Sequence, residues 1–270
     1  VMLRGQGAVP FRNGEVVLEG GAGSVPPGLT AIKYLPSANL TVVSVGPGKE
    51  QATVRRLRGQ GRRAGVNRVA TATATVNDSL RSFQWHFDAV QANLAWDITA
   101  GSGVTVAVLD SGLRIPSLGG DGIGSVTYIA GCDVVNGDDD PDDEDGHGTH
   151  VSGTISQTTN NSVGTAGLAF QATIMPIKVL DASGSGSFAD IAEGIYRAVD
   201  AGANVINMSL GVNARLGLTN DPFTDPALDY AYANGVTVIC AAGNDGHRKN
   251  VSYPAIYPTT IAVGATDFRN

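Results

Sequence analysis

From residue 103 onward, hydrophobic positions fall into short runs that are apolar on both faces. These runs are rich in Val and Ile and have the length of single strands: 103–110, 172–181, 203–210, 235–240 and 259–266. Strands of this kind are typical of a parallel sheet that helices cover on both sides. We therefore predict five parallel strands in this part of the chain.

Helical patterns lie between these runs. In "SFADIAEGIYRAVDAG" (187–202), Ser187 is the predicted N-cap, and in "DPALDYAYANG" (225–235) that role falls to Asp225. Because strands and helices alternate, the pattern predicts an α/β fold, a doubly wound and mostly parallel sheet with helices on both faces. Functional side chains in such a fold gather at the carboxyl ends of the strands.

The N-terminal part of the chain has a different pattern. Residues 29–76 alternate between short apolar runs, such as "LTVVSV" (40–45), and the helical segment "KEQATVRRLRG", which ends in glycine. This pattern predicts a small α+β module. Residues 77–97 read as a connecting arm, so the predicted organisation is an N-terminal region, 1–76, followed by a larger domain, 77–270.

The composition is that of a globular protein. Of the 270 residues, 42% are hydrophobic and 16% are charged, which is unlike a disordered or coiled-coil chain. No apolar run approaches the roughly 18 residues that a membrane-spanning helix needs, so we expect no membrane partner. The first residues also lack the apolar core of a signal peptide. The two cysteines, Cys132 and Cys240, are too few for a disulfide framework and leave one bridge or two buried thiols.

Charge is unevenly distributed along the chain. Residues 1–76 carry ten Lys and Arg against three Asp and Glu, a net +7, and residues 77–270 carry a net −14. The cluster "RRLRGQGRR" (55–63) has two interpretations, a nucleic-acid arm or the solvated end of a helix. No aromatic residues lie between the arginines to stack on bases. We favour the solvated helix and expect no nucleic-acid partner.

Three polar side chains lie where this fold gathers functional groups. Asp110 ends a strand in "VAVLDSG" and Asn244 follows another in "AAGNDG", although either one alone is explained as a cap or a turn former. His147 and His150, in "DGHGTHVSGT", are three residues apart without the intervening Glu of a helical zinc pair. His147 begins a predicted helix, whose dipole favours the neutral imidazole that a general base needs.

Taken together, these motifs resemble the subtilisin-like serine protease family, the subtilases. "VAVLDSG", "DGHGTHVSGT", "NMSLG" and "AAGN" follow one another within residues 77–270, and residues 29–76 resemble the family's propeptide. The resemblance implies that Asp110 orients His147, which acts as general base and then acid, and that Asn244 donates to the oxyanion. It also implies that His150 is a buried structural neighbour.

The resemblance further implies a cleft that binds an extended polypeptide substrate. The residues implied are an exposed strand edge, Ser209, Leu210 and Gly211, and the wall of a primary specificity pocket, Ala241, Ala242 and Gly243. Members of the family are secreted, so we expect an extracellular enzyme. Its own propeptide would be its intramolecular inhibitor.

The attacking serine of the family lies in a Gly-Thr-Ser-Met-Ala segment that these 270 residues do not contain. Ser111 belongs to the Asp110 motif and Ser152 to the helix of His147, and neither stands in such a context. We therefore expect an endopeptidase cut short before its nucleophile and inactive as it stands. The alternative is a degenerate, non-catalytic protease fold that binds peptides or calcium.

An acidic segment, "CDVVNGDDDPDDEDG" (132–146), precedes His147. It lacks the glycine and the bidentate Glu of an EF-hand loop, and the simplest interpretation is a solvated acidic loop. However, eight of the 14 residues from 133 to 146 are acidic, and a hard cation would relieve their repulsion. The segment also resembles a calcium loop of some subtilases, which implies five Ca²⁺ ligands: Asp133, Asn136, Asp138, Asp140 and Asp142.

A second calcium site of the family is matched only in part. "TNNSVGTAG" (159–167) resembles its loop, with Asn161 as the side-chain ligand. Ser117 stands where the resemblance would place an Asp ligand. The sequence therefore does not predict a complete second site.

Overall fold

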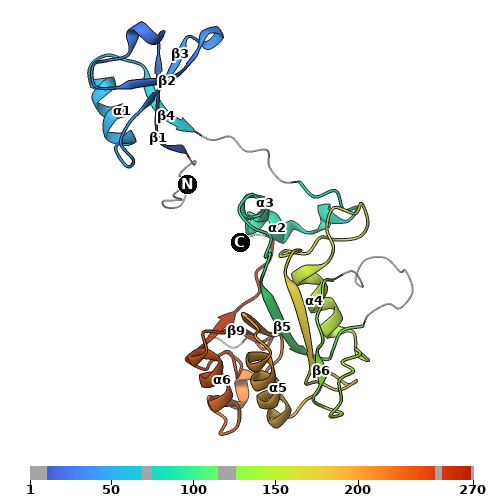
Figure 1. Cartoon of the computed structure of the whole chain (residues 1–270). Coiled ribbons are helices and arrows are strands. Elements are labelled where there is room, and N and C mark those ends of the chain that lie inside the picture. Colours follow the sequence, from blue (N-terminus) through green and yellow to red (C-terminus); the bar gives the residue numbers. More distant parts are fainter. Residues whose placement is uncertain (1–10, 69–74, 115–125, 247–250, 269–270) are drawn as a thin grey trace. The chain divides into compact units, whose positions relative to one another are not determined.

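The chain divides into two compact units, residues 1–72 and 73–270. The computed structural model describes residues 11–68, 75–114, 126–246 and 251–268 (Figure 1). None of the described helices is long and apolar enough to cross a membrane. Short 3-10 helices are found at Ala22–Ser24, Pro36–Ala38, Arg81–Phe83 and Ala214–Leu216.

The first unit is an antiparallel sheet with one helix on it. Its strands lie in the order β2-β3-β1-β4. Helix α1 packs on the sheet because its Val54 and Leu57 meet Val16 and Val43 in one buried cluster. The unit is the small α+β module that the sequence predicts, but it begins before the predicted residues 29–76, because β1 lies between β3 and β4 in the sheet. Its elements are β1 (Phe11–Glu19), β2 (Thr30–Leu35), β3 (Leu40–Ser44), α1 (Glu50–Gly59) and β4 (Ala64–Arg68).

The second unit opens with two short helices, α2 (Trp85–Ala89) and α3 (Ala92–Trp96). Phe87 and Trp96 pack edge to face, and Phe170 extends this aromatic cluster. The indole N–H of Trp96 donates to the carbonyl of Leu168 at 2.7 Å. These contacts attach the connecting arm to the unit whose sheet follows it.

The second unit contains a six-stranded sheet in the order β10-β9-β8-β5-β7-β6, and every pair is parallel. Each of the five predicted apolar runs matches one of its strands, although β9 extends one residue beyond its run, to Ala241. The sixth strand, β6, has only two residues and starts the acidic segment, so no pattern could predict it. The strands are β5 (Thr105–Asp110), β6 (Cys132–Asp133), β7 (Thr173–Lys178), β8 (Val205–Met208), β9 (Thr237–Ala241) and β10 (Thr260–Val263).

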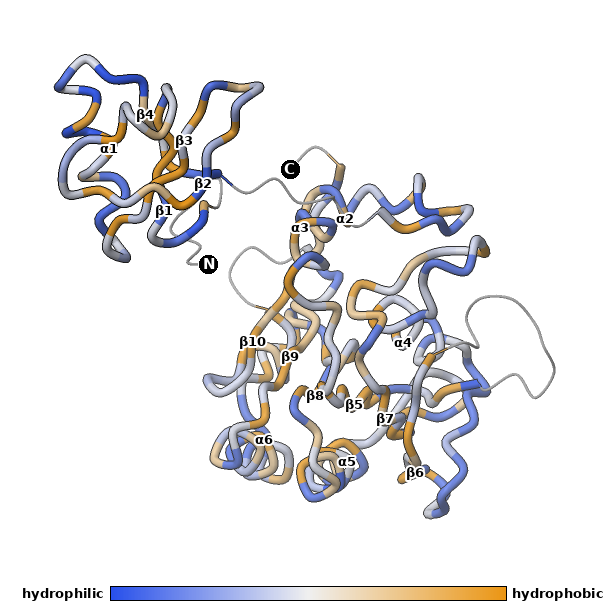
Figure 2. The backbone as a smooth tube through the Cα atoms, turned by 45° about the horizontal axis from the view of Figure 1, so that its top comes forward, coloured by the Kyte–Doolittle hydropathy of each residue, from blue (hydrophilic) through white to orange (hydrophobic). Residues whose placement is uncertain are grey.

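Helices cover both faces of this sheet (Figure 1). They are α4 (His147–Ser156), α5 (Phe188–Asp200) and α6 (Thr224–Ala233). In β5, Leu109 packs in the cluster that includes Ile195 of α5. The neighbouring residue Val108 points to the other face of the sheet and packs in the cluster that includes Val151 of α4. Figure 2 shows the hydrophobic strands between these helices. The sheet is therefore doubly wound, as predicted.

The helix starts follow the sequence prediction in one case and depart from it in another. Ser187 caps α5, because its hydroxyl accepts a hydrogen bond from the N–H of Asp190 at 3.1 Å. Asp225 does not cap α6 and lies within its first turn, so that prediction is wrong. The preceding loop supplies the cap through Asp221, whose carboxylate accepts from the N–H of Thr224 at 2.8 Å.

Candidate active site

Asp110 and His147 meet at the carboxyl end of β5. Asp110 is fully buried, and its Oδ1 lies 2.7 Å from Nδ1 of His147, the first residue of α4. The same oxygen accepts from the N–H of Ser111 at 2.8 Å. The side chain of His147 is 50% exposed. When Nδ1 carries the proton, the carboxylate holds the ring and leaves Nε2 available as a base.

A glycine allows α4 to approach β5 this closely. A Cβ on Gly148 would collide with the carbonyl oxygen of Gly112 and crowd the Cβ of Asp110 at 3.1 Å. Any larger residue at 148 would therefore push the first turn of α4 away from the strand. The 2.7 Å contact between His147 and Asp110 depends on this packing.

A buried carboxylate, that of Asp143, caps the same helix. Its Oδ1 accepts from the N–H of Gly146 at 2.8 Å, and its Oδ2 accepts from the N–H of Thr149 at 2.8 Å. Burial raises the pKa of Asp143, but the hydrogen bonds from Thr149, Gly146 and Ser111 outweigh it and lower the pKa to about 2. Sequence reasoning missed this residue because it lies four residues before the first residue of α4, outside the N-cap position, which Gly146 occupies.

A cleft of about 670 Å³ opens beside His147. Ser209, Leu210 and Gly211 follow β8 and belong to no strand. Of the predicted pocket wall, Ala242 is not among the lining residues. Its N–H donates to the carbonyl of Val263 at 2.9 Å, in the sheet. The cleft brings together most of the residues that the sequence singled out: His147, Ser209, Leu210, Gly211, Ala241, Gly243 and Asn244.

Comparison with known proteins gives the family. The model of the subtilase family (peptidase S8) matches residues 101–270. The chain belongs to the subtilase family. Thermitase from Thermoactinomyces vulgaris is 41% identical over 196 residues, which are 72% of this chain and 66% of thermitase. Subtilisin Savinase from Lederbergia lenta is 41% identical over 192 residues, 70% of this chain and 66% of that protein.

A solved structure has the same fold as this subtilase. It is described as proteases from Pseudoalteromonas arctica PAMC 21717 and has a TM-score of 0.64 and 31% sequence identity, covering 73% of this chain and 67% of that one. The chain spans about half to two thirds of the length of the curated relatives above and others like them.

The second histidine of the motif does not lie where the resemblance implies. His150 is exposed, so its interpretation as a buried neighbour is wrong. Helix α4 buries Gly148, Ser152 and Ser156, which share the face toward the sheet, and His150 lies on the opposite face. Ser152 is fully buried, and neither it nor Ser111 lines the cleft.

The acidic segment of this subtilase forms a tight turn after β6. The backbone groups of Asp133 and Asp138 pair with each other at 2.9 and 3.0 Å. Asp133 is buried, and its two carboxylate oxygens accept from the N–H and the side-chain amide of Asn136, each at 2.8 Å. Both carboxylate oxygens of Asp133 therefore already have hydrogen-bond donors, and both come from Asn136.

The other predicted calcium ligands have separate partners. Asp138 accepts from the N–H of Asp140 at 2.9 Å, and Asp142 lies 3.8 Å from the guanidinium of Arg114. Within the described residues, no three His, Cys, Asp or Glu side chains gather as a metal site. This geometry does not fit a calcium ion, and binding would require Asp133 and Asn136 to give up their mutual hydrogen bonds.

The loop of the second calcium motif is held by a residue that sequence reasoning missed. Asp78 is buried, and its carboxylate accepts from the N–H groups of Asn160 at 3.0 Å and Asn161 at 3.3 Å. The side-chain oxygen of Asn161 accepts from the N–H of Val163 at 2.9 Å. Ser117 lies outside the described residues.

The two cysteines are free, buried thiols. Cys132 is in β6 and Cys240 in β9, with three strands of the sheet between them. At about 4.8 Å between neighbouring strands, this separation is too large for a disulfide. Burial raises the pKa of Cys240 to about 12, so this thiol stays protonated at neutral pH.

Proposed function

We propose that this chain comprises a propeptide-like region, residues 1–76, and most of the catalytic domain, residues 77–270, of a secreted serine endopeptidase. The enzyme would cleave peptide bonds with an Asp–His–Ser triad. The observation that carries the proposal is the 2.7 Å contact between His147 and buried Asp110 beside the cleft. Membership of the subtilase family supports the same class of reaction.

In the proposed mechanism each polar group has a role. Asp110 keeps the proton on Nδ1 of His147 and stabilises the imidazolium, while Nε2 takes the proton of the attacking serine and passes it to the leaving amine. Asn244 lines the same cleft and would donate its side-chain amide to the oxyanion. Loss of one such donor lowers kcat by about 10²–10³.

The substrate would be an extended polypeptide. Ser209, Leu210 and Gly211 follow the end of β8 and line the cleft, which supports the proposal that their main-chain groups would pair with a substrate strand. Recognition through the main chain tolerates many side chains. The small residues Ala241 and Gly243 leave room for one substrate side chain in the primary pocket.

The attacking serine is expected in a Gly-Thr-Ser-Met-Ala segment, which the 270 residues do not contain. A test therefore compares three proteins: the 270-residue chain, the chain extended with the corresponding segment of thermitase, and the extended chain with His147→Ala. We expect peptide hydrolysis only by the extended parent. His147→Ala should lower kcat by about 10⁴-fold or more, because the triad acts as a unit.

A matched control is His150→Ala in the extended chain, since His150 is on the same helix and exposed. It should keep its activity. Hydrolysis that survives His147→Ala would refute the mechanism. A folded extended chain that binds peptides without cleaving them would favour the non-catalytic alternative.

A further inference from the structure

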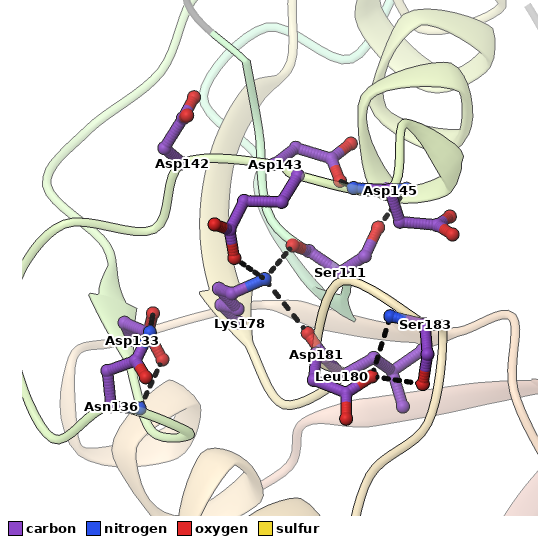
Figure 3. A network of polar contacts seen from close by, with 12 residues as sticks. Ser111, Asp133, Asn136, Asp142, Asp143, Asp145, Lys178, Leu180, Asp181 and Ser183 are labelled. Atoms are coloured by element: carbon purple, nitrogen blue, oxygen red, sulfur yellow. Dashed lines mark hydrogen bonds and ion pairs between the residues drawn. The ribbon is translucent and has the colours of Figure 1, made fainter.

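Lys178, the last residue of β7, is buried close to the candidate active site. It is 1% exposed and is the only Lys, Arg or His among the buried residues of the described ranges. Its ammonium group donates to the carbonyls of Ser111 at 2.8 Å and Leu180 at 3.0 Å. Glu144 lies 3.9 Å away. Figure 3 shows the Lys178 side chain pointing into this group of oxygens.

The register of the sheet places two buried carboxylates beside this lysine. Lys178 is the cross-strand partner of Asp110 in β5 and of Asp133 in β6. In-register residues of parallel strands project to the same face of the sheet. Lys178 therefore projects to the same face of the sheet as two buried acids, at the carboxyl end of the strands, while its ammonium group contacts the carbonyls of Ser111 and Leu180.

Burying an ammonium group at this position has a large desolvation cost. Taking the charge out of water costs several kcal/mol, and an apolar side chain of similar volume often stabilises a fold as well or better. What an apolar side chain could not do is donate to two carbonyl oxygens at once. Lys178 thus adds a side-chain link between the loop after β5 and the end of β7, beyond the backbone bonds that Val179 and Leu180 donate to the carbonyl of Asp110 at 2.9 and 3.1 Å.

The segments joined by Lys178 are parts of the candidate site. Ser111 follows Asp110 directly, and its N–H donates to the same carboxylate oxygen that contacts His147. Leu180 lines the cleft. Glu144 lies in the segment that leads into α4.

We propose that Lys178 is a positioning residue that holds the Ser111 carbonyl, and through it the Asp110 carboxylate, in place to fix His147. The inference rests on the proposed Asp110–His147 pair. Lys178 touches neither the substrate nor the reacting atoms. It acts through the backbone of the loop that follows β5.

The test is NMR on the 270-residue chain, which needs no peptidase activity. A proton on Nδ1 of His147, held in a 2.7 Å hydrogen bond to a buried carboxylate, should give a strongly downfield resonance that exchanges slowly with water. The His147→Ala variant assigns it. We expect Lys178→Met to speed its exchange by about tenfold or more, because exchange follows local opening.

Two further variants make this result specific. Lys178→Arg should largely restore slow exchange, since a guanidinium still donates to both carbonyls. Lys33→Met removes a lysine from the exposed strand β2 and should change nothing. A merely structural role would speed exchange across the whole second unit, so backbone amides of β8 and α5 are followed as a reference.

The outcomes separate the two proposals. A parent chain without the downfield resonance would overturn the Asp110–His147 pair, and both proposals with it. A folded Lys178→Met chain with unchanged His147 exchange would overturn only the positioning role. If Lys178→Met does not fold, Lys178→Gln, which keeps one donor group, should give intermediate exchange. If neither folds, Lys178 serves the fold itself and the positioning role is refuted.

Discussion

Single buried carboxylates hold the backbone in place where the chain changes direction. Asp143 accepts from N–H groups at the start of α4, and Asp78 does so in the loop at 160–161. Glu50 plays this part in the first unit, where it accepts from the N–H groups of Gly14 at 2.7 Å and Gly48 at 3.1 Å. For Asp143 and Glu50, whose pKa values these hydrogen bonds lower, the ionised oxygen is the better acceptor, so protonation weakens the arrangement.

Glu50→Gln should lower the stability of the first unit in a pH-dependent way. Burial raises the pKa of Glu50, but hydrogen bonds from the Gly14, Glu50 and Gly48 backbones lower it overall from 4.5. A carboxylate whose pKa is lowered on folding stabilises the fold at pH values above its ordinary, unfolded-state pKa. This contribution is lost as pH falls through the folded-state pKa. In urea unfolding of residues 1–76, the free energy of unfolding of the parent should therefore exceed that of the variant at pH 7. This difference should become smaller toward pH 3.

Glu19→Gln is the control, because this half-exposed carboxylate only pairs with Arg63 at the surface. It should change stability little at either pH. If Glu50→Gln lowered the free energy of unfolding by the same amount at pH 7 and at pH 3, this would contradict the role assigned to the carboxylate.

Among the elements, α4 packs closely against the end of β5 through Gly148. Gly148→Ala would place a methyl group against the carbonyl of Gly112. Overpacking of this kind costs about 1–3 kcal/mol, and here it also displaces His147. We expect a lower unfolding free energy in urea and faster exchange of the His147 Nδ1 proton. Gly59→Ala in α1, where nothing lies within 4 Å of the added Cβ, should be neutral or slightly stabilising. If Gly148→Ala and Gly59→Ala changed the unfolding free energy equally, the steric explanation would be ruled out.

The acidic segment before α4 gives a prediction about calcium. The sequence implies one Ca²⁺ here, whereas the described residues form no metal site, and a calcium titration decides between the two. An ion that binds only the folded state would stabilise it by RT ln(1 + [L]/Kd), about 2.7 kcal/mol at a hundredfold excess. The Tm should then rise with added calcium and fall with a chelator. Asp138→Asn with Asp140→Asn should shrink the rise, whereas Asp229→Asn on α6 should leave it intact. An unchanged calcium dependence in the double variant would place the ion elsewhere.

At the scale of the whole molecule, the two halves of the chain carry opposite charge, +7 for residues 1–76 and −14 for residues 77–270. The first unit has a hydrophobic core of its own, built on Val16, Leu18, Val43 and Leu57. A propeptide-like role requires such a module to bind the domain that follows it. Long-range attraction between opposite charges would promote this encounter.

Residues 1–76 and 77–270, prepared as separate proteins, should bind each other in calorimetry. Salt screens exposed charges over a Debye length of about 10 Å at 0.1 M and 3 Å at 1 M, so affinity should fall as salt rises. Replacing the exposed Arg55 and Arg56 with Gln should reduce both the affinity and its salt dependence, whereas replacing the uncharged Gln51 with Ala should not. Absence of binding at low salt would rule out the propeptide role.

The sequence by itself determined five of the six strands of the parallel sheet, the cap of α5 and membership of the subtilase family. These features are local, because an apolar run, a capping serine or a motif such as "DGHGTHVSGT" is complete within a few residues. The helix start at His147 and the strand end at Asp110 could likewise be placed from such patterns. That their side chains lie 2.7 Å apart is a result of the tertiary structure.

Only the tertiary structure decided the features that depend on register and packing. His150 is exposed because α4 turns its small residues to the sheet, and the cap of α6 comes from Asp221 in the preceding loop. Lys178 is far from Asp110 and Asp133 in the sequence and becomes their neighbour through strand pairing. A local pattern specifies which face of an element is buried, but the partners across that face are set by the register of strands that are distant in the chain.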